Sequence, residues 1–428
     1  MGPTTDDSPA AGSTGSSSWK WGICVLLLLA TTLNYMDRQA LSQTANEIRQ
    51  DFSLDAQQYS YLGGLFNVGF GIGALLFGYL VDRGNLRWIY AGLVLAWSAV
   101  GFATGFVTLF WQLLVCRLLL GVFEAGNWPC GIMTVKRVLK PAERSLGNGM
   151  FQSGTALGAI LIPLVVVACY NSSDPGDPRW WQLPFRIIGV LGVVWVGLWL
   201  WLVKSDRIAP VPPSKTDLLA QDSYWDLWTD HRFYVMIVVI VGVNVPWRTC
   251  GEWLPQFLRK EKGYSTESVQ YISSAFYLAA DAGSICSGLL TLWLIRRGST
   301  LYAGRMISFV VCAALTLLLL VAVVLPKGWL LIVVLLLIAF GTLGSFSTYF
   351  AFSQDISAKH QGKVTGTLGM LNSICMGGLV VFQGWMIKNT DESYAVAIGM
   401  TAFAPLVAVL AIALFWKPRK PAGVATDG

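Results

Sequence analysis

Two pairs of charged residues interrupt segments of the sequence that are otherwise apolar. Arg117 and Glu124 lie seven positions apart within the apolar segment 107–133, and Asp37 and Arg38 are neighbours within an earlier one. A charged side chain inside a bilayer costs on the order of 3 kcal/mol or more, so such residues are candidates for function. A structural ion pair between helices is the alternative. Because both signs of charge recur on two segments, we favour a site for an organic anion beside a carboxyl group that can bind a proton.

The composition is that of a membrane protein. The chain has 428 residues, of which 54% are hydrophobic and 13% charged, whereas a soluble domain carries about 25% charged residues. Twelve apolar segments approach the length of about 20 residues that spans a bilayer. They are 21–41, 58–81, 86–105, 107–133, 145–170, 184–203, 232–258, 268–295, 302–325, 328–352, 362–387 and 394–416. We therefore predict an all-α membrane protein with twelve transmembrane helices in two six-helix bundles.

The basic residues predict the orientation in the membrane. With the N-terminus inside, nineteen Lys and Arg lie inside, eight lie outside and three lie within helices. This excess predicts that both termini lie in the cytoplasm and that the protein spans the cytoplasmic (inner) membrane several times. The basic cluster 259–262 is an exception, because it falls on the outer side. The net charge of +6 is thus explained by the orientation in the membrane and does not indicate a nucleic-acid partner.

A polar segment rich in Pro and Asp divides the chain into two halves. The predicted order is a disordered cytoplasmic tail, an N-terminal six-helix bundle, a cytoplasmic linker, a C-terminal six-helix bundle and a second cytoplasmic tail, at residues 1–18, 19–203, 204–231, 232–417 and 418–428. The segment after the second helix, 78–87, is repeated weakly at 288–298, an offset of 210 residues. A repeat near half-length predicts a two-fold transporter that holds its solute between the halves at mid-membrane.

No enzyme or metal chemistry is indicated. The eight Cys are scattered without a CxxC pair, and the two His stand at helix ends. Neither a disulfide framework nor a metal site follows from such spacing, and no nucleophile–base arrangement is present. We expect no cofactor and no metal, with H⁺ as the coupling ion.

Helical geometry places the charged residues at similar depths. Seven residues make about two turns, so Arg117 and Glu124 share one helix face about 10 Å apart. The predicted topology puts Arg117, Asp37 and Arg38 in the outer half of the membrane and Glu124 near its middle. An arginine grips a carboxylate with two parallel hydrogen bonds. Arg38 is expected to offset Asp37 or to share the anion.

The segment Gly78-Tyr-Leu-Val-Asp82-Arg83-Gly84-Asn-Leu-Arg87 resembles the loop motif of the major facilitator superfamily, and the resemblance covers residues 20–417. Four further segments resemble the anion:cation symporter branch, whose members carry hexuronates, galactonate, glucarate and related anions: 34–42, 124–129, 149–159 and 362–366. The segments Phe276–Gly283 and Trp181–Phe185 are most similar to those of hexuronate transporters.

This resemblance implies roles for the charged residues. Asp37 and Glu124 match positions that couple transport to protons, and Arg117 matches one that binds the substrate carboxylate. Asp82, Arg83 and Arg87 match gating positions that latch neighbouring helices while the transporter is open outward; a charge cluster that only sets orientation is the alternative. Leu292 replaces the acidic residue in the second copy, so the latch there is expected to be incomplete.

Several polar residues within apolar segments could either bind the solute or pack between helices. Asn148, Gln152 and Thr155 follow each other on one face of the fifth predicted transmembrane helix, where they contact sugar hydroxyls or join helices beside Gly154 and Gly158. The remaining candidates for polyol binding or interhelical packing are Asn67, Asn372 and Ser373.

Three charged residues in the C-terminal half also have alternatives. Arg248 and Glu252 lie one turn apart, so they form a self-neutralising pair, unless Arg248 is a second group that binds the anion. Asp281 titrates, contacts hydroxyls or pairs with Arg248.

We therefore expect a proton-coupled symporter that imports a sugar-acid anion by alternating access, a hexuronate such as glucuronate or galacturonate first, with galactonate, glucarate or another organic anion as the alternative. Two buried carboxyls would allow more than one proton per anion. A drug antiporter needs no buried Arg, and a non-transporting nutrient sensor would add a long cytoplasmic extension where only ~12 residues follow the last helix. The expected partners are the anion, protons and the bilayer, and we expect a monomer.

Overall fold

The computed structural model describes residues 17–54, 56–174, 177–204, 208, 224–357, 360–390 and 393–416. These residues are almost entirely helical, and no strand occurs among them. The predicted tails, apart from residues 17 and 18, and most of the predicted linker lie outside the described residues.

The first half of the chain forms eight described helices. They are α1 (Ser17–Gln43), α2 (Ala45–Asp51), α3 (Ala56–Arg83), α4 (Leu86–Thr104), α5 (Phe110–Glu124), α6 (Asn127–Val138), α7 (Arg144–Ser172) and α8 (Gln182–Leu202). The second half begins after a short 3₁₀ turn, η2 (Tyr224–Trp228). It comprises α10 (His231–Gln256), the π-helical turn η3 (Phe257–Glu261), α11 (Thr266–Arg296), α12 (Leu301–Leu317), α13 (Leu319–Val324), α14 (Trp329–Ser353), α15 (Gln361–Asn389), α16 (Tyr394–Gly399), the 3₁₀ turn η4 (Met400–Phe403) and α17 (Ala404–Phe415).

Within the described residues, twelve helical segments are long and apolar enough to cross a membrane, in the order and positions that the sequence predicts. The fourth differs most, because it extends to Val138 rather than to residue 133. It is also broken between α5 and α6, directly after Glu124. Pro129 stands in the first turn of α6, and it cannot donate a backbone hydrogen bond to the preceding turn. The break therefore lies beside one of the predicted site residues.

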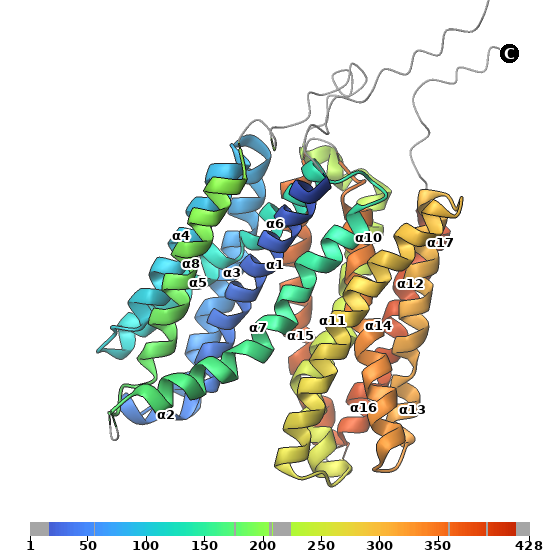
Figure 1. Cartoon of the computed structure of the whole chain (residues 1–428). Helices are drawn as coiled ribbons and strands as arrows, with labels where there is room; N and C mark the ends of the chain where they lie inside the picture. The colour runs from blue at the N-terminus through green and yellow to red at the C-terminus, as the bar shows by residue number, and fades with distance from the viewer. Residues whose placement is uncertain are drawn as a thin grey trace, which may run out of the picture.

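Figure 1 shows α1–α8 on one side and α10–α17 on the other, with α7 and α11 between them. We call these groups the first and second halves. The helix α1 begins and α17 ends at the upper end of the figure. This upper end is where the halves are joined.

Two pairs of helices form the seams between the halves, and glycines allow their close approach. At the α3–α15 seam, a Cβ on Gly78 would lie 2.6 Å from the carbonyl oxygen of Gly362. At the α7–α11 seam, a Cβ on Gly288 would lie 2.6 Å from Cα of Leu146. Gly78 and Gly288 are the positions that the internal repeat relates, and each packs against the first turn of a helix from the other half. The repeat predicted from the sequence is thus present in the packing.

Candidate functional site

Four charged side chains of the first half gather where α1 meets α5. Asp37, Arg117 and Glu124 have 1%, 1% and 0% of their surface exposed, and the side chain of Arg38 is 24% exposed. Asp37 interacts electrostatically with both Glu124 and Arg117. The helices bring together the four residues that the sequence singled out, and we call them the charge cluster.

Glu124 is held by Arg38. The Arg38 Nε donates a hydrogen bond to Glu124 Oε2 at 2.7 Å, and the guanidinium lies 5.0 and 4.6 Å from the ring centroids of Phe66 and Phe70 on α3. Aromatic faces stabilise a cation at such distances. The second carboxylate oxygen of Glu124 has no hydrogen-bond partner among the described residues. The ion pair between Arg38 and Glu124 thus links α1 to α5, which belongs to the fourth predicted transmembrane segment.

This pairing corrects the expectation that Arg38 offsets Asp37. Consecutive residues of an α-helix project about 100° apart, so the two side chains meet different neighbours. Asp37 faces α4, where a Cβ on Gly101 would lie 2.9 Å from its Oδ1. Neither carboxylate oxygen of Asp37 has a hydrogen-bond partner within the described structure.

Arg117 is buried with donors to spare. Its Nε and Nη2 have no hydrogen-bond partner among the described residues, and its guanidinium lies 5.7 Å from the ring centroid of Phe185 on α8. A buried charged group without hydrogen bonds is costly. The arrangement is therefore suited to an added anion that accepts two parallel hydrogen bonds.

The polar face predicted on the fifth transmembrane segment, α7, divides into two parts. Asn148 Nδ2 donates to Gln354 Oε1 of α14's C-terminal end at 3.3 Å, so it joins the two halves. Gln152 and Thr155 are buried, and Gln152 Oε1 and Thr155 Oγ1 have no partner among the described residues. These two side chains remain free to bind hydroxyl groups.

The other polar candidates differ in their surroundings. Asn67 is exposed on α3. Asn372 has a buried Oδ1 without a described partner, whereas Ser373 donates to the Gly369 carbonyl of its own helix at 2.9 Å. These positions place Asn372, but not Ser373, among the side chains with unused hydrogen-bonding capacity.

The three charged site candidates of the second half, Arg248, Glu252 and Asp281, do not form one cluster. Arg248 Nη2 lies 3.2 Å from Glu252 Oε2, and their side chains are 53% and 41% exposed. The self-neutralising pair therefore forms. Asp281 forms no described ion pair, so the alternative in which it pairs with Arg248 is wrong.

Of the predicted gating residues, Asp82 joins the two halves. Its carboxylate oxygens accept hydrogen bonds from the backbone N–H groups of Gly362 at 2.6 Å and Lys363 at 2.9 Å. A carboxylate at a helix N-terminus caps free N–H groups and complements the helix dipole. Arg83 stacks on Tyr79, with its guanidinium 4.0 Å from the ring centroid, and Arg87 donates to the Leu200 carbonyl at 2.7 Å within the first half.

Further contacts between the halves were not predicted. Lys136 donates to Gln361 Oε1 at 3.0 Å and to the Ser357 carbonyl. Asp355 accepts a hydrogen bond from Arg305 and lies 3.7 Å from Arg144. In the sequence, Lys136, Arg144 and Asp355 stand in predicted loops and Arg305 at the start of the predicted segment 302–325, and none was predicted to join the halves.

An aromatic pair closes the same region from within. Trp128 of α6 and Phe350 of α14 stack with ring centroids 5.8 Å apart. Hydrogen bonds between described residues of the two halves link the ends of α3 and α6 with the start of α15, and the first part of α7 with α11 and with the end of α14. Arg144 and Asp355 add an ion pair at the same place. The halves are therefore joined at one end.

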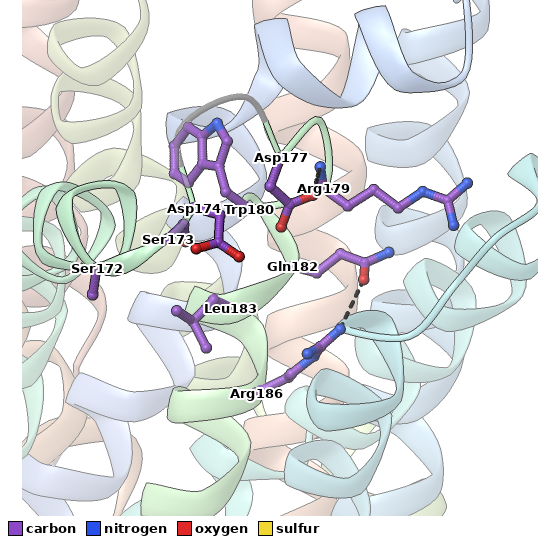
Figure 2. Close-up of a pocket in the computed structure, with 9 residues that line it drawn as sticks. All are labelled: Ser172, Ser173, Asp174, Asp177, Arg179, Trp180, Gln182, Leu183 and Arg186. Atoms are coloured by element: carbon purple, nitrogen blue, oxygen red, sulfur yellow. Dashed lines mark hydrogen bonds between the residues drawn. The ribbon is translucent and has the colours of Figure 1, made fainter.

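A separate cavity of about 280 Å³ lies between the end of α7 and the start of α8 (Figure 2). Its lining residues are Ser172, Ser173, Asp174, Asp177, Arg179, Trp180, Gln182, Leu183 and Arg186. Arg186 is already engaged, because it donates to Gln182 Oε1 at 2.9 Å and to the Gly105 carbonyl at 2.6 Å. None of the predicted site residues lines this cavity.

Three relatives illustrate what the chain is similar to. It is 26% identical to the hexuronate transporter of Bacillus subtilis (strain 168), with 95% of this chain and 98% of that protein covered. It is 23% identical to the probable L-galactonate transporter of Escherichia coli (strain K12), with 93% and 89% covered. It is 24% identical to the galacturonate transporter of Dickeya chrysanthemi, with 64% and 81% covered.

Solved structures share the fold. The proton:xylose symporter XylE bound to 6-bromo-6-deoxy-D-glucose superimposes with a TM-score of 0.76 at 11% identity, covering 94% of this chain and 96% of that one. The E. coli fucose:proton symporter FucP gives 0.71 at 14% identity, with 92% and 97% covered. The family model described as Major Facilitator Superfamily matches residues 27–379. The chain is therefore a member of the major facilitator superfamily.

Proposed function

We propose that this protein is a proton-coupled symporter that imports a sugar-acid anion, a hexuronate such as glucuronate or galacturonate first. The observation that carries the proposal is Arg117, a buried guanidinium with unused donors beside two buried carboxyl groups. Galactonate or another organic anion is the alternative, because relatives named for those solutes are about as similar to this chain.

Arg117 is the proposed site for the substrate carboxylate. The planar fork of a guanidinium matches a carboxylate, which supplies both charge and orientation. Arg38 is a weaker candidate, because Glu124 and two aromatic rings already hold it.

Charge balance supports proton coupling. With Asp37, Glu124, Arg38 and Arg117 all ionised, their charges sum to zero, so a bound monoanion would leave one uncompensated negative charge in a buried site. One proton restores neutrality. Asp37 is the proposed first carrier because neither of its oxygens has a hydrogen-bond partner, and a buried ionised carboxylate without partners is costly. Glu124, which is held by Arg38, is the second proposed coupling residue.

The neutral side chains support a hydroxyl-rich solute. Gln152, Thr155 and Asn372 carry buried oxygens without described partners, and a polyol can donate hydrogen bonds to each kind. A site built to hydrogen-bond hydroxyl groups discriminates against solutes that lack them. These residues are proposed to contact the sugar chain, while Arg117 binds the acid group.

Alternating access is the proposed mechanism. The upper end of Figure 1, where the halves are joined, is taken as the cytoplasmic side because the basic residues predict that side. The conformation described here is then closed inward and would open outward. The seams at Gly78 and Gly288 would separate when the solute is released into the cell.

Counterflow tests the proposal. Purified protein in liposomes loaded with one unlabelled sugar acid should concentrate trace labelled D-glucuronate or D-galacturonate. Xylose and fucose should not compete, because neither carries a carboxylate for Arg117. Lack of exchange with every hexuronate, aldonate and aldarate tried, by protein that is folded and monodisperse, would reject the proposal.

A further inference from the structure

One stripe of α11 faces the first half of the molecule. Tyr277, Asp281, Ser284 and Gly288 follow at spacings of four, three and four residues, which places them on a single helix face. Ser284 Oγ donates to the Gly149 carbonyl of α7 at 3.1 Å, and Gly288 packs against Leu146. Tyr277 interacts electrostatically with Tyr35 of α1. Asp281 therefore lies on the face of α11 that is directed toward α1 and α7.

Asp281 lies just beyond the joined region. It precedes Ser284 by three residues, which is ~4.5 Å along a helix axis. Ser284 makes a hydrogen bond between the halves. Across from this level, α7 carries Gln152, one turn beyond Gly149, with its unused Oε1. Asp281 is thus on the second half's side of the space in which a solute would be held.

The carboxylate of Asp281 is uncompensated. Its Oδ1 is buried and has no hydrogen-bond partner among the described residues, and Asp281 forms no ion pair with any of them. The basic residue of the second half that it was expected to meet, Arg248, is exposed and paired with Glu252. Arg117 and Arg38 belong to the charge cluster of the first half.

We propose that Asp281 makes the site selective for sugar acids with one carboxylate. With the substrate carboxylate on Arg117, the other end of the solute would meet Asp281. A hydroxyl there donates a charge-assisted hydrogen bond to the Asp281 carboxylate. In its ionised form, Asp281 instead repels the second carboxylate of an aldarate such as glucarate or galactarate. This inference rests on the proposed function and narrows its substrate class to hexuronates and aldonates.

Competition in the counterflow assay tests the selectivity. Liposomes are loaded with D-glucuronate, or with whichever sugar acid exchanges fastest, and external D-glucarate competes with the labelled monoacid at pH 7.5. In wild type, we expect glucarate to compete about tenfold less well than the unlabelled monoacid. Asp281→Asn should raise the relative competition by glucarate to within about threefold, since a like charge is removed.

Two further variants keep the test specific. Asp281→Glu keeps the charge and should keep the discrimination. Glu252→Gln removes a carboxylate of the same half that is exposed and paired, and should leave the ratio unchanged. If Asp281→Asn does not fold, the competition by glucarate relative to the monoacid is compared between wild type and Asp281→Ser instead.

The outcomes separate the two proposals. Wild type that exchanges no sugar acid rejects the proposed function. Wild type that exchanges glucarate as well as glucuronate leaves the proposed function standing and overturns the selectivity. A discrimination that persists in Asp281→Asn and Asp281→Ser also overturns the role of Asp281, because the repulsion must then come from another group.

Discussion

The two seams between the halves occupy equivalent places in the repeat, but they differ in one decisive side chain. Four residues after Gly78, Asp82 caps the first N–H groups of α15. Four residues after Gly288 stands Leu292, which is buried, and no side chain caps the N-terminus of α7. The α3–α15 seam is therefore joined by a charged side chain, whereas the α7–α11 seam is joined by close packing and by the hydrogen bond from Ser284 to the Gly149 carbonyl.

The same asymmetry holds at mid-membrane. The first half carries the charge cluster of Asp37, Arg38, Arg117 and Glu124, whereas Asp281 of the second half forms no ion pair among the described residues. A repeated helix arrangement can thus hold different chemistry in each copy. We infer that the first half supplies the anion and proton sites and that the second half supplies shape, hydroxyl contacts and selectivity.

Arg117→Lys should have the largest effect. Lysine keeps the charge but cannot form the two parallel hydrogen bonds of the guanidinium, and losing a charged hydrogen bond costs about 3 kcal/mol, or about 100-fold in uptake. Initial uptake rates in proteoliposomes measure this change. Near-normal anion affinity of Arg117→Ala by calorimetry would remove Arg117 from the site.

Glu124→Gln should separate exchange from accumulation. The variant leaves Arg38 without its charged partner, so the empty site carries an extra positive charge. This charge disfavours the conformational change by which the empty transporter returns to the outward-open state. Counterflow should stay within about threefold of wild type, while accumulation driven by a pH gradient is lost. Glu252→Gln is the matched control and should accumulate normally. Accumulation by Glu124→Gln would show that this carboxyl is not required for coupling.

Asp82→Asn should impair turnover without changing binding. The amide keeps the shape of the cap but loses its charge, which weakens the α3–α15 seam by about 1 kcal/mol and slows transport by about fivefold. Anion affinity, measured by calorimetry in detergent, should remain within about twofold because Asp82 touches no solute. A collapse of affinity in folded protein would contradict the gating role.

Leu292→Asp should give the smallest change and sharpens the comparison between the seams. A carboxylate at this position would face the uncapped N-terminus of α7 and stabilise the joined state by less than about 1 kcal/mol, slowing turnover about twofold. Leu292→Asn controls for polarity without charge. In the double variant with Asp82→Asn, the new cap should restore part of the lost turnover; no interaction between the two changes would mean that the seams are not equivalent.

The helices could be predicted closely because the bilayer imposes one length and one composition on every span. The break after Glu124 could not be predicted, because the sequence around Pro129 is also compatible with one continuous helix. Likewise, helical periodicity predicted similar depths for Asp37, Arg38, Arg117 and Glu124. It could not predict which neighbouring helix each side chain faces. Arg38 was therefore assigned to Asp37 rather than to Glu124.

The contacts of the joined end were the least predictable part. The gating role proposed for Asp82 came from a motif, and its partner is a helix N-terminus that meets Asp82 only when the two halves pack together. Lys136 donates to Ser357, and Asp355 meets Arg305 and Arg144, all across long sequence separations. Nothing in their local sequence distinguishes them from charges that set membrane orientation.

The most direct test of the central claim is proton movement caused by the anion itself. Liposomes that contain the protein and a trapped pH-sensitive dye, with no initial ion gradient, are mixed with D-glucuronate or the best exchanged sugar acid. Wild type should acidify the interior, and Asp37→Asn should not, although it still performs counterflow because the amide mimics the protonated carboxyl. Wild-type transport without acidification, or acidification of equal size in Asp37→Asn, would contradict the account.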